Sequence, residues 1–203
     1  MVIKYDSKVA QIRMFSDIQR HVEIIEQMYL AGIDRKENFS KEISDKCMEV
    51  SQNSSLTECE KDDEICHLLE NNYSQDIIEL LEEMQIVSFC KIIEITIKRM
   101  LKVSGLLPEE TINKTFNFSC LKSVLNSLGC DITQVQGFEA YDELRCINNC
   151  IKHSGTVCVK LAEFDGWQKE MRITNCRQAY VRLEVDVQKF VQNLGVCLAE
   201  KIA

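Results

Sequence analysis

The sequence predicts an all-α fold, and two of its features support that prediction. Only seven glycines and one proline occur among 203 residues, which leaves few of the tight turns that a β-sandwich or a β-barrel needs. Apolar side chains also recur at steps of three and four residues, the period of an amphipathic helix. With 45% apolar and 28% charged residues, we expect one domain over residues 1–203, a bundle of about six or seven helices.

The predicted helices differ in how many of their faces are apolar. The first one should end near Gly32, and Thr57 and Glu60 have the spacing of a capping box that opens a later helix. The segment 77–103 is apolar on more than one face, as expected of a long central helix surrounded by others. The expected helices cover 7–30, a weaker stretch at 39–50, a segment following Thr57, and 77–103, 118–128, 138–153 and 177–201.

One segment, 156–174, has no helical period. Val157, Val159 and Leu161 alternate like a strand, so a short β-hairpin with 171–174 is the most regular structure that we expect there. Trp167 lies in this segment, where it would either cover the core or stack on a base. We favour the first role.

The net charge of −8 is unevenly distributed along the chain. The segment 37–83 holds fourteen acidic residues and three lysines, a local charge of −11, so the remaining residues carry +3. Such an acidic segment is either a solvated surface or a docking face for a basic protein partner. Charges also interrupt the apolar stretch 77–103, so we expect no membrane span.

The eleven cysteines show neither a disulfide framework nor a zinc pattern. Their number is odd, no CxxC pair occurs, and no charged segment followed by an apolar one opens the chain. We therefore expect free thiols, a cytoplasmic location, and neither a metal nor another cofactor.

The densest polar pattern lies on the predicted helix 138–153. One of its faces carries two cations, two amides and a phenol, and a histidine stands at its end next to Ser154-Gly155. A guanidinium neutralises a phosphate, and an imidazole transfers protons near neutral pH, so this face could bind and cleave a phosphodiester. The residues are Tyr141, Arg145, Asn148, Asn149, Lys152 and His153.

An all-helical chain with an arginine and a histidine on one late helix resembles the HEPN superfamily of helical nucleases from toxin-antitoxin and phage-defence systems. The resemblance implies metal-independent RNA cleavage by a homodimer, with Arg145 as the phosphate-binding cation, Asn149 as a supporting amide and His153 as the acid/base. The polar face itself adds Tyr141, Asn148 and Lys152 as expected substrate contacts. Seven residues separate Arg145 from His153, and Cys146 follows Arg145, two departures that leave open a HEPN-like fold which only binds.

Two other functions stay open from the sequence. The chain could be a non-enzymatic immunity protein or antitoxin that docks a basic partner through the segment 37–83. Alternatively, the polar face of the helix 138–153 could bind a nucleotide rather than RNA.

Overall fold

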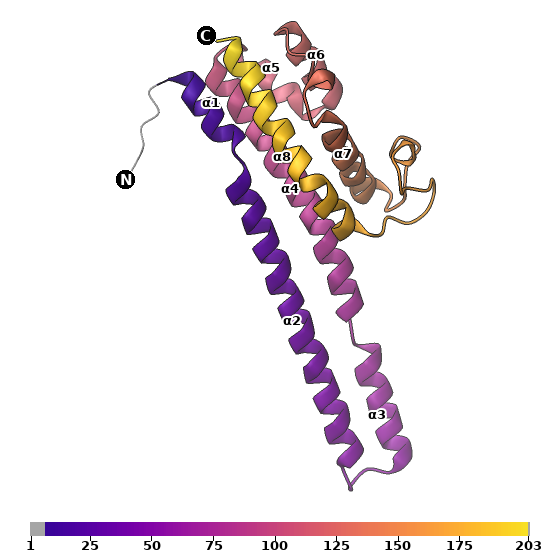
Figure 1. Ribbon diagram of the computed structural model, residues 1–203. Helices are drawn as coiled ribbons and strands as arrows, with labels where there is room; N and C mark the ends of the chain where they lie inside the picture. Colours follow the sequence, from indigo (N-terminus) through magenta and orange to yellow (C-terminus); the bar gives the residue numbers. More distant parts are fainter. Residues whose placement is uncertain (1–6, 203) are drawn as a thin grey trace.

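The computed structural model describes residues 7–202, and this part of the chain forms eight α-helices and no β-strand (Figure 1). The all-α prediction is confirmed, with one helix more than the expected seven because α5 was not foreseen. The separate helix expected at 39–50 is wrong, since those residues belong to α2. The helices are α1 (Lys8–Ser16), α2 (Gln19–Gln52), α3 (Glu58–Glu70), α4 (Ser74–Ser104), α5 (Glu109–Asn113), α6 (Phe118–Ser127), α7 (Phe138–His153) and α8 (Cys176–Glu200). Three short 3-10 helices are η1 (Lys114–Phe116), η2 (Ile132–Gln134) and η3 (Leu161–Glu163).

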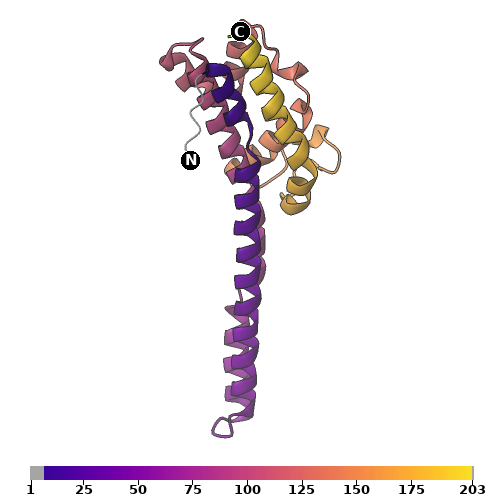
Figure 2. The ribbon, with the colours of Figure 1, turned by 60° about the vertical axis from the view of Figure 1, so that its left-hand side comes forward.

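The helices form a body and a projecting arm (Figures 1 and 2). The arm, residues 37–73, consists of the second half of α2, a turn, and α3 running back beside it. Ile43 is its one buried apolar side chain among those described. The predicted capping box is confirmed at its tip, where the Glu60 carboxylate accepts the backbone N–H of Thr57 at 2.8 Å. The arm coincides with most of the acidic segment.

The body is built around α4, the predicted long central helix. It packs against α1, α2, α5, α7 and α8, and its Phe89, Ile93 and Met100 have no exposed surface. Phe89 meets Tyr180 of α8 edge to face, with ring centroids 5.5 Å apart. Burial of several faces of α4 explains why its sequence lacks a single apolar stripe.

The expected helix end near Gly32 is wrong. The chain instead breaks at 17–18, between α1 and α2, and α2 continues unbroken through Gly32. A Cβ atom at Gly32 would lie 2.5 Å from the side chain of Leu81 on α4. The glycine therefore allows close packing between two helices and does not end one, a role that depends on a residue far away in the sequence.

Backbone and side-chain hydrogen bonds both hold the segment between α7 and α8. The expected short hairpin is present without regular strands: one antiparallel bridge joins Thr156 to Arg172, and three backbone hydrogen bonds of 2.8–3.0 Å link 155–157 to 170–173. Trp167 packs against the core and donates its Nε1–H to the buried carboxylate of Glu143 at 2.7 Å. Arg182 of α8 binds the same carboxylate with two hydrogen bonds, of 2.6 and 2.9 Å. Trp167 thus covers the core, as favoured from the sequence.

The expectation that every cysteine is a free thiol is wrong for two of them. Cys130, just before η2, forms a disulfide with Cys197 of α8. The other nine cysteines are free. The two partners are 67 residues apart in sequence, so only the tertiary fold brings them together. None of the helices within 7–202 has an apolar stretch long enough to cross a membrane.

Gly137, directly before α7, offers a test of how the body is packed. Its φ is +89°, and a Cβ atom there would overlap the carbonyl oxygen of Asp186. Gly155 also has a positive φ, of +64°, but open space around it. We expect Gly155→Ala to lower the free energy of unfolding by about 1–2 kcal/mol, and Gly137→Ala to lower it by at least about 2 kcal/mol more. Urea denaturation of both variants measures the difference, and equal losses would contradict this packing.

Candidate ligand-binding cavity beside α7

A cavity of about 460 Å3 lies where α7 faces α6 and α4. This volume is within the usual range for small-molecule sites. Four of the residues predicted from the sequence line it, namely Tyr141, Arg145, Asn148 and Asn149. The other lining residues come from α4, the η1–α6 junction and the segment after α7: Cys90, Glu94, Ile97, Thr115, Phe116, Asn117, Phe118, Ser119, Leu121 and Lys160.

The two cations of the cavity share one carboxylate. Arg145 donates from Nε and Nη2 to Oδ1 of Asp142, at 3.0 and 2.5 Å. The Nζ of Lys160 lies 2.8 Å from the other oxygen, Oδ2. Burial alone would raise the pKa of Asp142, but its bonds to Lys160 and Arg145 outweigh burial and lower the pKa below its ordinary value. Asp142 is therefore ionised at neutral pH and fixes both cations at the cavity wall.

Aromatic rings form a second side of the cavity. The guanidinium of Arg145 lies over the ring of Phe118, 4.2 Å from its centroid, which further restricts its orientation. Phe116 is 71% exposed although its ring is large and apolar. An exposed aromatic ring at a polar cavity is a surface on which a planar ligand can stack.

Asn148 supplies an acceptor without a donor. Its side chain is only 3% exposed, and its Oδ1 has no hydrogen-bond partner. Buried polar atoms are nearly always paired, because leaving one unpaired costs about 1–3 kcal/mol. Because this oxygen is itself buried, a ligand in the cavity would donate to it, and remove this cost, after the Asn148 side chain turns toward the cavity.

The remaining polar groups of the cavity add hydrogen-bond donors and one negative charge. Asn149 is exposed and lines the cavity with an amide. Burial raises the pKa of Tyr141, so its phenol stays neutral and able to donate. Glu94 of α4 also lines the cavity. The cavity can thus bind a ligand that combines an anionic group, an uncharged donor and a flat ring.

The structure separates the predicted polar row into two groups. Lys152 and His153 are exposed at the end of α7 and do not line the cavity. Eight helical residues at 1.5 Å each place His153 about 12 Å along the axis from Arg145. Tyr141, Arg145, Asn148 and Asn149 therefore line one cavity, and His153 lies outside it.

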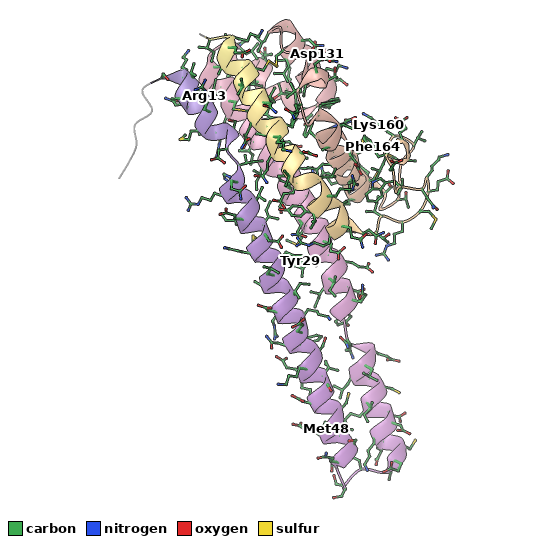
Figure 3. The ribbon with its side chains drawn as sticks, viewed as in Figure 1. Arg13, Tyr29, Met48, Asp131, Lys160 and Phe164 are labelled. Carbon is green, nitrogen blue, oxygen red and sulfur yellow. A yellow bond between two sulfur atoms is a disulfide. The ribbon has the colours of Figure 1, made fainter. Side chains whose placement is uncertain are left out.

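Sequence reasoning missed Asp142, Lys160 and Phe116 as parts of the site. Asp142 lies three residues before Arg145, a spacing that pairs charges on a helix, so a signal for it was present. Lys160 belongs to the irregular segment shown beside α7 in Figure 3, and no local pattern predicts its approach. Phe116 lies in η1, just before the predicted helix 118–128, so no periodic pattern marks it.

A search for metal-binding groups and comparisons with known proteins give no further information on the site. Among residues 7–202, no group of three or more His, Cys, Asp or Glu side chains is placed to hold a metal ion. Comparison of the chain with protein-family models, with curated proteins and with solved structures finds no match.

Asp142 gives the site a pH-dependent contribution to stability. The pKa of Asp142 is lowered in the folded chain. The carboxylate therefore stabilises the fold above its pKa in the unfolded chain, about 3.9, and this stabilisation is lost as the pH falls through its pKa in the folded chain. We expect Asp142→Asn to destabilise the chain at pH 7 by about 2–3 kcal/mol, and the gap from the wild type to narrow below about pH 4.

Denaturation of both proteins across this pH range is the measurement. Glu110→Gln is the control, because its carboxylate forms an exposed ion pair with Lys114 and should change stability by less than about 1 kcal/mol. A gap for Asp142→Asn that is the same at pH 3 and pH 7 would disprove the assignment.

Proposed function

We propose that the chain is a HEPN-like protein that binds single-stranded RNA, with one nucleotide held in the cavity beside α7. The observation that carries the proposal is the pair of cations, Arg145 and Lys160, that line one cavity together with Asn148, whose buried Oδ1 is unpaired. A phosphate would bind the two cations, and a base amine or a ribose hydroxyl would donate to Asn148. A free nucleotide offers the same groups and is the smallest ligand of this kind.

Two further features support RNA over a simple anion. Phe116 offers a ring for stacking, and base-aromatic stacking contributes about 1–3 kcal/mol per base. Lys152, one turn beyond Asn148 on α7, is exposed and can meet a neighbouring phosphate. The negative charges of Asp142 and Glu94 offset the positive charges of Arg145 and Lys160. Stacking and hydrogen bonds must therefore contribute to ligand binding together with electrostatic attraction.

Cleavage is the further step of the proposal. His153 would transfer the proton of a 2′-hydroxyl, with Arg145 and Asn149 on the phosphate, as the HEPN resemblance implies. Since His153 stands outside the cavity, about 12 Å along α7 from Arg145, His153 of one subunit would act with Arg145 and Asn149 of the other across a homodimer.

Four variants separate binding from cleavage. Arg145→Ala removes a cation of the cavity and Asn148→Leu removes the unpaired acceptor, so each should weaken binding of a short fluorescent single-stranded RNA at least about tenfold. Lys122→Ala removes an exposed cation of α6 that does not line the cavity, and should change the affinity less than about twofold. His153→Ala should abolish cleavage of the same RNA while binding persists.

Fluorescence anisotropy measures the affinities, and gel electrophoresis of the RNA measures cleavage. Equal losses from Arg145→Ala and Lys122→Ala would indicate diffuse charge in place of a site. Binding without cleavage by the wild type would support a HEPN-like binding protein with a degenerate site.

A second function, docking of a basic protein partner, has its own supporting observation. All ten carboxylates from Glu37 to Glu70 are exposed on the arm. The arm projects from the body, so that a partner could surround it without meeting the cavity (Figure 2). This is the geometry expected of an immunity protein or antitoxin that masks a basic surface.

Charge reversal on the arm tests the docking function. Asp62, Asp63 and Glu64 are neighbouring exposed acids of α3, and changing all three to lysine should abolish capture of a basic protein by the tagged chain from its host. The captured protein should also dissociate at about 1 M salt, where the Debye length is about 3 Å. The matched control reverses Glu109, Glu110 and Glu139 on the body and should retain capture; loss with both triple variants would contradict docking at the arm.

A further inference from the structure

Two free cysteines meet beside the cavity. Cys150 lies on α7 and is buried, and Cys158 lies in the segment after α7 and is exposed. The backbone N–H of Cys158 donates to the Sγ of Cys150 at 3.4 Å, and the two thiols form a hydrogen bond with each other. A thiol pair with one exposed and one buried member has the arrangement of an attacking and a resolving cysteine.

The surroundings of the two thiols differ in the way that such a pair requires. Burial alone would raise the pKa of Cys158, but backbone hydrogen bonds from Leu161 and Lys160 and the thiol of Cys150 outweigh it and lower the pKa. Burial raises the pKa of Cys150, so this thiol stays protonated and donates to Cys158. Burial also raises the pKa of Cys146, one turn earlier on α7, to about 11.

We propose that Cys158 is an oxidant-reactive residue that forms a disulfide with Cys150 when the chain meets hydrogen peroxide. The Cys158 thiolate attacks one peroxide oxygen, the O–O bond breaks, and a sulfenic acid and a hydroxide ion form. The sulfur of Cys150 then attacks the sulfenic sulfur, the S–O bond breaks, and the thiol proton leaves with the hydroxyl group as water. Two thiols are oxidised by two electrons, and one peroxide is reduced to two waters.

This proposal is independent of RNA binding, because it needs no ligand in the cavity. It does place an oxidation site two residues from Lys160, which lines the cavity and binds Asp142. The Cys130–Cys197 disulfide lies elsewhere, between the start of η2 and α8, and serves as an internal reference for the mapping.

Peptide mapping after brief exposure of the full chain to hydrogen peroxide tests the pair. Trypsin cleavage after Arg145, Lys152 and Lys160 yields the peptides 146–152 and 153–160, which the new disulfide would join. We expect this linked pair to accumulate at least about tenfold faster than Cys120, an exposed cysteine of α6, loses its thiol. Mass spectrometry of alkylated digests follows both species.

Three variants identify the sulfur atoms. Cys146→Ser should leave the linked peptides unchanged, although Cys146 shares a peptide with Cys150. Cys150→Ser should abolish them and leave a Cys158 sulfenic acid that dimedone traps, and Cys158→Ser should leave Cys150 reduced. The proposal is overturned if Cys158 reacts no faster than Cys120, or if it oxidises without linking to Cys150.

Discussion

Two adjacent buried carboxylates on α7 position the irregular segment between α7 and α8. Asp142 binds Lys160 of that segment, and Glu143 accepts a hydrogen bond from Trp167. Each carboxylate also binds an arginine, Arg145 on α7 itself or Arg182 on α8. An unpaired buried carboxylate would cost several kcal/mol, so both depend on these partners. These side-chain bonds fix the segment to α7 and α8, while backbone hydrogen bonds between 155–157 and 170–173 close it on itself. Through Lys160 the segment also lines the cavity.

The net charge of −8 is divided in space as well as in sequence. The arm carries exposed carboxylates around a minimal core, and the body carries a cavity whose cations are held by Asp142. At physiological ionic strength the Debye length is about 8 Å, so exposed charges on the projecting arm act on the cavity only weakly. An acidic chain can therefore hold an anionic ligand, and each region can have a partner of its own.

Local signals in the sequence predicted much of the helical frame. The period of apolar residues located α6, α7 and α8 to within about one residue at each end, because a helix that buries one face repeats its pattern along that face. The capping box at Thr57 was equally readable, since both of its hydrogen bonds join residues three apart. The polar face of α7 also followed from helical spacing, and four of its residues do meet in one cavity.

The features that the sequence could not decide all depend on residues distant along the chain. At Gly32, α2 approaches Leu81 of α4 so closely that a Cβ atom would overlap its side chain, and Cys130 bonds to Cys197, which is 67 residues away in sequence. Lys160 joins the site only through Asp142, and the oxygen of Asn148 is unpaired only because the tertiary packing buries it. The sequence alone thus determined the helical fold and the polar face of α7, since both are periodic. Tertiary structure decided which residues of that face share a site, because long-range packing leaves no periodic trace.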